Sequence, residues 1–199
     1  MNNPDDSSNA NLTAPEPAAP ALDLETPGAR SGPLPPEGAF PGPPLNLRIS
    51  SMMRKLSPPA ARVFLHLVEG LDPGEARTID NAGGAFMGVS VDCLRRERLT
   101  DAGETGALYA VAHRFESNGD LVPDPDVEFF VVPDAADPLG RAVYPTAIDH
   151  PPPFGYRRYV EFGSDGLPDA INRRGQADLA AFCDAWMRNI RQQQGLVLR

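Results

Sequence analysis

Two apolar runs, separated by a short polar segment, dominate the centre of the chain. Residues 108–115 and 127–132 are rich in aromatic and β-branched side chains, which favour strands over helices. Between the runs lies Asn118-Gly119, and both of these residue types tolerate the positive φ angles of a type I′ turn. The pattern therefore predicts a two-residue hairpin that joins two antiparallel strands.

Counting outward from this turn gives a register for the hairpin. The count places Ala110 opposite Val127. It also places Leu108 opposite Phe129, so that an almost wholly apolar face forms, and this face is the predicted core side. A one-residue slip would exchange the two faces, because side chains alternate along a strand.

The other face of the predicted hairpin carries the polar groups, with His113 opposite Asp124. Pro123 and Pro125 have no N–H to donate, so a bulge or a break is expected beside them. The histidine, the turn residues and the carboxylates together form the candidate binding site. Its members are His113, Asn118, Asp120, Asp124, Asp126 and Glu128.

Helical spacing of apolar residues predicts a helix over residues 176–193, with Trp186 as the central core anchor. Its expected buried stripe consists of Leu179, Phe182, Cys183, Trp186, Met187 and Ile190. Closer to the N-terminus, Ser57-Pro58 predicts the start of another helix, because serine caps helices and proline suits their first position.

Shorter segments complete the predicted fold. Strand-like patterns occur in four further segments, residues 77–80, 85–92, 143–148 and 156–162. Residues 93–98 are interpreted as a helical turn, and Pro145 predicts an edge or bulged position for its strand. Together these segments predict an α+β fold, in which an antiparallel meander of about five strands packs against an N-terminal helix and a C-terminal helix.

Composition divides the chain into two parts. Residues 1–46 are acidic, rich in Pro, Ala, Gly and Ser, and without hydrophobic periodicity, so a disordered tail is expected there. Residues 47–199 are expected to form a single α+β domain. Within the tail, residues 30–36 match a basic residue followed by PxxP, which binds aromatic grooves as polyproline II. A plain linker is the alternative interpretation of the same residues.

The net charge of −9 argues against direct nucleic-acid binding. An acidic surface could instead approach a basic protein partner, and simple solubility is the alternative interpretation of the same charge. Cys93 and Cys183 are too few and too far apart for a disulfide framework or a zinc knuckle, and no metal or cofactor is expected. Neither a secretory signal nor a bilayer-spanning apolar run occurs, so we expect no membrane association and a cytoplasmic location. The pattern specifies neither the identity of the partner nor the oligomeric state.

Residues 112–130 and 179–195 carry a recognisable family pattern. The positions that match it are His113, Phe115, Asn118, Gly119, Asp120, Asp124, Pro125, Asp126, Phe182, Trp186, Asn189, Gln194 and Gly195. On these residues the chain resembles an uncharacterised bacterial domain-of-unknown-function family, over about residues 76–196. It departs from the pattern at residues 149–155, where His-Pro-Pro-Pro replaces a Tyr-Gln-Gln-like run. The resemblance implies an association with plasmids, integrative elements and phages, and it implies no activity.

Two functional hypotheses follow. In the first, the chain is an accessory protein that acts through protein–protein interaction, and the Asn-Gly-Asp run is turn chemistry. In the second, it is a divalent-metal-dependent hydrolase or nuclease whose ligands are His113, Asp120, Asp124 and Glu128. The chain lacks HExxH spacing and any nucleophile motif, so a non-enzyme is favoured. Convergence of the histidine and the carboxylates in a concave site would support the enzyme hypothesis.

Overall fold

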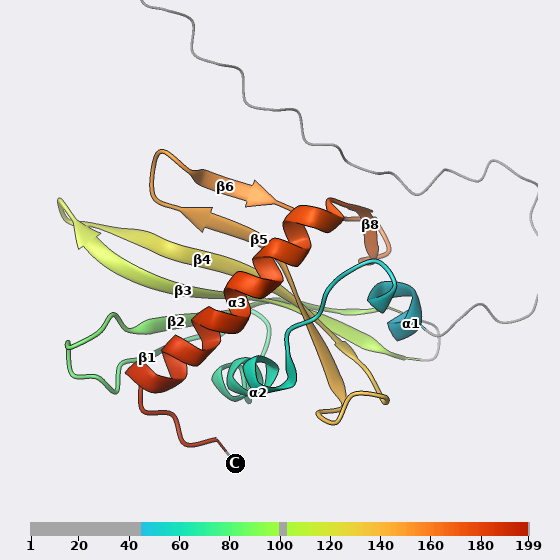
Figure 1. The fold of residues 1–199 in the computed structure, drawn as a ribbon, viewed down its shortest axis with the longest axis horizontal. Helices are drawn as coiled ribbons and strands as arrows, with labels where there is room; N and C mark the ends of the chain where they lie inside the picture. The colour runs from blue at the N-terminus through green and yellow to red at the C-terminus, as the bar shows by residue number, and fades with distance from the viewer. Residues whose placement is uncertain (1–44, 100–102, 199) are drawn as a thin grey trace, which may run out of the picture.

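A computed structural model describes residues 45–99 and 103–198 of the chain (Figure 1). The tail expected to be disordered lies outside the described residues, apart from its last two positions, and so does the PxxP segment. The helices are α1 (Leu45–Ser50), α2 (Pro58–Leu67) and α3 (Arg173–Gln193). The strands are β1 (Ala76–Ile79), β2 (Val89–Arg98), β3 (Thr105–Ser117), β4 (Asp120–Pro133), β5 (Arg141–His150), β6 (Gly155–Arg158), β7 (Val160–Phe162) and β8 (Pro168–Ile171).

The first six strands form one sheet in the order β1-β2-β3-β4-β5-β6, and every neighbouring pair is antiparallel. This arrangement is the meander that the sequence predicts, flanked by helices from both parts of the described chain. The expected strand over residues 156–162 is two strands, since β7 leaves the sheet and pairs with β8 instead. The α+β prediction is confirmed.

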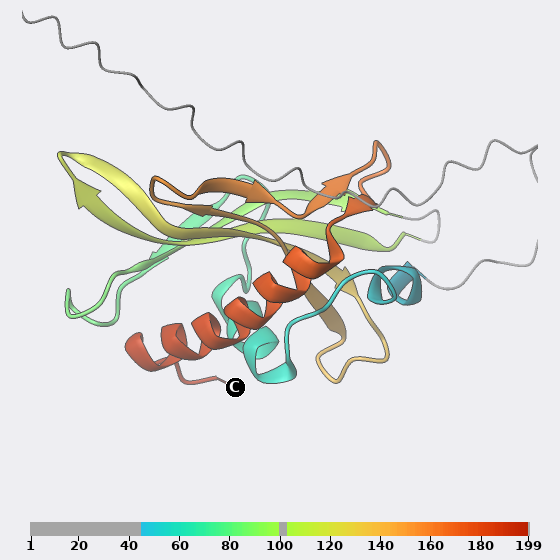
Figure 2. The ribbon, with the colours of Figure 1, turned by 45° about the horizontal axis from the view of Figure 1, so that its top comes forward.

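One face of the sheet is covered by α2 and α3, which lie side by side and cross the strands (Figures 1 and 2). Beneath them, Phe64 of α2 packs on the rings of Tyr109 and Phe129. Trp186 is 6% exposed and belongs to this core, as predicted. Phe182 is 40% exposed, so its placement in the buried stripe was wrong.

The opposite face of the sheet is covered at one end only. There a second apolar cluster joins alternate residues of the central strands, such as Phe130 and Tyr144, to Ile49 of α1. Val160 and Ile171 bring the β7–β8 hairpin into the same cluster. The sheet therefore has two packed layers at this end, and the other end of the same face carries polar side chains.

The hairpin turn is the predicted one. Ser117 pairs with Asp120, and the two residues between them have positive φ angles of 54° for Asn118 and 88° for Gly119. Both central positions of a type I′ turn need positive φ, which explains why this dipeptide stands there. The local chemistry of the turn thus fixes where the two longest strands meet.

The register predicted beyond the turn was wrong by one residue. Val127 faces Val111 instead of Ala110, and Phe129 faces Tyr109. The cause is a bulge in β4, where Asp124 and Pro125 lie opposite the single residue His113 of β3. A bulge beside the two prolines is expected from their missing N–H groups. Because the bulge adds one residue to the count, every side chain of β3 before it lies on the face opposite to the predicted one. The predicted faces of β4 are unaffected.

Of two smaller predictions, one was wrong and one is confirmed. Residues 93–98 continue β2 and do not form a helical turn, although the strand is irregular between Cys93 and Arg95. Pro145 lies at a register shift between β4 and β5, which is the bulged position that its missing N–H favours. Irregular strand positions are thus where the sequence pattern was hardest to interpret.

Candidate functional site

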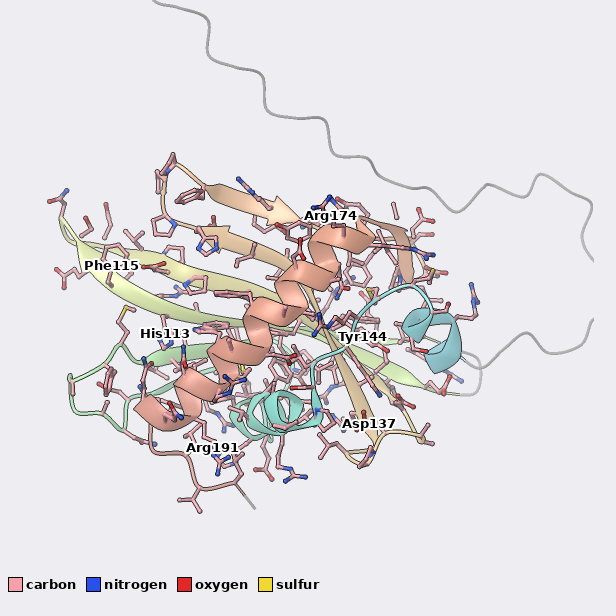
Figure 3. The ribbon with its side chains drawn as sticks, in the orientation of Figure 1. His113, Phe115, Asp137, Tyr144, Arg174 and Arg191 are labelled. Atoms are coloured by element: carbon pink, nitrogen blue, oxygen red, sulfur yellow. The ribbon has the colours of Figure 1, made fainter. Side chains whose placement is uncertain are left out.

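His113 does not join the predicted carboxylates. Its side chain lies under α3, where it is 4% exposed and meets the ring of Trp186 edge-on at 5.6 Å between centroids (Figure 3). The Nδ1–H group donates to the carbonyl of Gly88 at 3.2 Å. Burial lowers the pKa of His113 below its usual 6.5, and the backbone carbonyls and Asp124 only partly oppose this effect. The residue is therefore a neutral core histidine.

The carboxylates of β4 lie on the other face of the sheet. Asp126 and Glu128 alternate with the buried Val127 and Phe129, so they point away from α2 and α3. Two further carboxylates belong to the same group, because Asp92 and Asp149 both lie close enough to Asp126 to raise its pKa. We call the four residues Asp92, Asp126, Glu128 and Asp149 the acidic strip.

Alanines alternate with carboxylates in one row of the acidic strip, and two carboxylates pair directly in the neighbouring row. Across the sheet, Asp92 pairs with Ala110, Ala110 pairs with Glu128, and Glu128 pairs with Ala147. In the neighbouring row Ala112 pairs with Asp126, which in turn pairs with Asp149. Sequence reasoning missed Asp92 and Asp149, and only the register of the sheet could have revealed them.

Like charges make this face electrostatically unfavourable. The pKa of Asp126 is raised to about 6, first by burial and then by its three acidic neighbours, while Arg114 at 3.6 Å lowers it. Glu128 accepts a hydrogen bond from the Tyr156 hydroxyl at 3.0 Å. The side chains of Asp92 and Asp149 form neither a hydrogen bond nor a salt bridge with any residue that the structure describes. Carboxylates that repel one another and lack a cation are a surface that a cationic partner would stabilise.

The end of the β3–β4 hairpin projects beyond its neighbours (Figure 1). Pairing with β2 ends at His113 and pairing with β5 ends at Asp126, so residues 114–123 pair only with each other. We call residues 114–123 the hairpin arm. Phe115 (Figure 3) and Leu121 are exposed on it, Leu121 by 68%. They lie on opposite faces of the arm, since Phe115 pairs with Val122 and Leu121 pairs with Glu116. The arm thus exposes one large apolar side chain on each face.

Three predicted site residues belong to the arm or to its base. Asn118 forms the turn, Asp120 closes it opposite Ser117, and Asp124 lies in the bulge at the base. Their backbone roles agree with the turn-chemistry interpretation. The six predicted site residues are thus divided between a core position, the arm and the acidic strip.

The predicted metal ligands are not assembled. Within residues 45–99 and 103–198, no three His, Cys, Asp or Glu side chains are grouped so that they could hold a metal ion. His113 is separated from Glu128 by the sheet itself. Cys93 and Cys183 are buried free thiols, and burial raises the pKa of each, which makes them poor nucleophiles. The geometry therefore offers no observation in favour of a hydrolase.

A groove of about 490 Å³ lies between the β5–β6 hairpin and α3. Aromatic rings dominate its wall, with His150 6.3 Å from Phe154 and 6.3 Å from Phe182 between ring centroids. Asp178 and Arg157 lie at its rim. Sequence reasoning missed this groove because it assigned Phe182 to the core. Its one signal was the departure from the family pattern at residues 149–155. We call it the aromatic groove.

A second cavity, of about 810 Å³, lies on another part of the surface and is basic. Arg62, Arg96 and Arg141 line it, next to Tyr109 and the C-terminal residues Val197 and Leu198. Arg96 is held in place by Asp72 and by the carbonyl of Leu71. None of the residues predicted from the sequence as a binding site lies in this cavity, which we call the arginine cavity.

Fold and surface together define a small α+β protein whose described part carries an acidic strip, a projecting hairpin arm and two surface cavities. The family described as Domain of unknown function (DUF6908) matches residues 60–196, and the chain belongs to this family. Comparisons with curated proteins and with solved structures found no match. Among the helices of the described part, none is long and apolar enough to cross a membrane.

Proposed function

We propose that this protein is an accessory protein of a mobile genetic element and that it acts by binding a basic protein partner. The observation that carries the proposal is the continuity of the acidic strip with the hairpin arm. Arg114 at the base of the arm forms a salt bridge with Asp126 of the strip, so the two surfaces meet. A partner that covers this junction meets both charged and apolar groups.

Charge supports a basic partner. The chain carries a net charge of −9, and two carboxylates of the acidic strip have no cation beside them in the described structure. Complementary charge on a partner would lower the repulsion within the strip and would also raise the association rate.

The hairpin arm supports an apolar contribution to binding. Phe115 and Leu121 are large apolar side chains with no core to fill, and burying such side chains contributes about 1.5–3 kcal/mol each. A projecting β-hairpin can insert into a pocket that a flat surface cannot reach. The partner we propose therefore combines a basic surface with an apolar pocket.

The biological setting in this proposal comes from the family resemblance. The resemblance seen in the sequence implies plasmids, integrative elements and phages, and we propose the same setting for this chain. A cytoplasmic location belongs to the same proposal. Direct binding to nucleic acid is disfavoured because carboxylates on the acidic strip would repel phosphates.

Affinity capture with the full-length chain tests the proposal. The bait is incubated with a nuclease-treated bacterial lysate, and captured proteins are identified by mass spectrometry. We expect basic proteins that are lost when the strip is neutralised by Asp92→Asn with Asp149→Asn. The same proteins should be lost with Phe115→Ser and Leu121→Ser in the arm. Raising the salt concentration should weaken capture, because exposed charges are screened.

The matched control neutralises two exposed carboxylates elsewhere, with Glu69→Gln and Asp169→Asn, and so changes the net charge equally. This control should capture the same proteins as the unchanged chain. Equal capture by the strip variant and the control, or capture of acidic proteins only, would contradict the proposal.

A further inference from the structure

We propose that residues 30–36 of this chain dock as a polyproline II helix in the aromatic groove of the same molecule. The inference concerns a surface separate from the acidic strip and is independent of the proposed partner. It joins the PxxP motif of the N-terminal segment to a groove that no described residue fills.

The groove has the chemistry that proline-rich segments need. Phe154 is 62% exposed, and Phe182 is 40% exposed although it lies on α3. Phe182 in turn stacks on Trp186 with 6.1 Å between ring centroids, which fixes the orientation of its ring. Proline rings pack on fixed aromatic faces of this kind, and the rigid polyproline II helix loses little entropy when it binds.

The spacing of the motif matches one side of such a helix. Polyproline II has three residues per turn, so Arg30, Pro33 and Pro36 fall on one ridge. Two prolines can thus face the aromatic wall while the arginine lies one turn beyond them. The remaining residues of the segment point away from the groove.

Charge complementarity favours a position for Arg30 beside Asp178 of the groove. The exposed side chain of Asp178 lines the groove and forms no hydrogen bond or salt bridge with any described residue. Arg30 is the one basic residue of the first 44, so it is the natural partner for this carboxylate. On the opposite rim, Arg157 can receive Glu37, which directly follows the motif. A guanidinium pairs with a carboxylate through charge-assisted hydrogen bonds.

The chain segment between the motif and α1, which we call the tether, is long enough to reach the aromatic groove. If residues 30–36 are docked, the eight residues 37–44 connect Pro36 to the start of α1 at Leu45, and nine steps of about 3.1 Å give about 28 Å. The span is short, because Ile49 of α1 packs in one cluster with Ile171, and Gly175 of the groove follows Ile171 by four residues. A tether of this length keeps the motif near the groove at an effective concentration of the order of millimolar. Even a weak contact is therefore occupied within one molecule.

Paramagnetic relaxation in the full-length chain tests the docking. Ser31→Cys carries a nitroxide at a position off the contact ridge, and the label is selective because Cys93 and Cys183 are buried. We expect amide signals of residues 154–159 and 175–182 to lose at least half of their intensity. The same label in a chain with Pro33→Ala and Pro36→Ala should leave these signals at full intensity.

Two further samples separate the alternatives. Phe154→Ala removes an exposed ring from a loop, so the fold is kept and the intensity loss at the groove should disappear. Labelled chain mixed with unlabelled, isotope-enriched chain should show no loss, because the contact is within one molecule. Losses in the mixed sample, losses around the arginine cavity instead of the groove, or evenly spread losses would each overturn the proposal.

Discussion

His113 stands edge-on to Trp186, with 5.6 Å between the ring centroids and 70° between the ring planes. The contact joins β3, opposite the bulge of β4, to the middle of α3, and the hydrogen bond to Gly88 adds the residue just before β2. A residue that the sequence suggested as a base or a metal ligand is therefore a packing residue. It is held at the meeting point of three elements.

Replacing His113 tests this structural role through pH. Burial lowers the pKa of the folded-state imidazole below 6.5, so the unfolded chain binds the proton more readily. The contribution of the neutral side chain is fully present above pH 6.5. It is lost as the pH falls through 6.5 toward the folded-state pKa, at up to about 1.4 kcal/mol per pH unit.

Urea unfolding at pH 7.5 and pH 5.5 measures the effect. His113→Gln should be less stable than the unchanged chain at pH 7.5, by about 1–3 kcal/mol, because packing and a hydrogen bond are lost. The difference should shrink at pH 5.5, since glutamine has no proton to take up. A difference that is constant across this range would show that His113 is not held neutral.

Asp126→Asn should stabilise the protein at neutral pH. Its folded-state pKa of about 6 lies above the usual 3.8, so the fold favours the protonated form. In the unchanged chain, the stabilising contribution of the protonated Asp126 carboxyl is complete below pH 3.8 and is lost as the pH rises through 6. Asparagine avoids the charge, and we expect a gain of about 1–3 kcal/mol at pH 7.5. Thermal or urea unfolding at pH 7.5 and pH 4 checks this, with no gain at pH 4.

Trp186→Ala should cost about 3–5 kcal/mol of unfolding free energy, because it removes a buried aromatic from the main core. Phe182→Ala provides the matched control on the same helix. Since that ring is 40% exposed, its loss should cost clearly less, about 1 kcal/mol. Equal costs in chemical denaturation would mean that α3 is rotated relative to the arrangement described above.

Gln194→Ala should destabilise the protein although it replaces a polar residue near the C-terminus. The buried amide accepts from the Asn81 N–H at 2.8 Å and donates to the Met87 carbonyl at 3.0 Å. Unpaired buried groups cost about 1–3 kcal/mol each, so a loss of about 2–4 kcal/mol is expected. The exposed neighbour Gln192, changed to alanine, should alter stability by less than about 0.5 kcal/mol. Similar losses for both variants would contradict this role.

The sequence was sufficient to predict the features that depend only on residues close together along the chain. The turn at Asn118-Gly119 needs only positive φ, and the helix around Trp186 needs only a repeated apolar spacing, so both could be found locally. The face of β3 could not, because a bulge opposite His113 shifts the count and the proline signal does not say on which strand the extra residue falls.

The candidate site shows the same limit. Asp126 and Glu128 were found because they alternate with apolar residues within one strand. Asp92 and Asp149 come from strands far away in the sequence, and only the sheet register brings them beside Asp126. The aromatic groove depends on the packing of α3 against a hairpin, which no local pattern encodes.

Both ends of α3 are fastened by buried amides. Gln176 donates to the carbonyls of Arg54 and Pro145 and accepts from the Arg54 N–H, while Gln194 joins the other end to the loop before β2. With its two termini tied, the helix has no loose end from which fraying can start. Hydrogen exchange along its middle should therefore follow opening of the entire domain, which makes α3 the natural gauge of global stability.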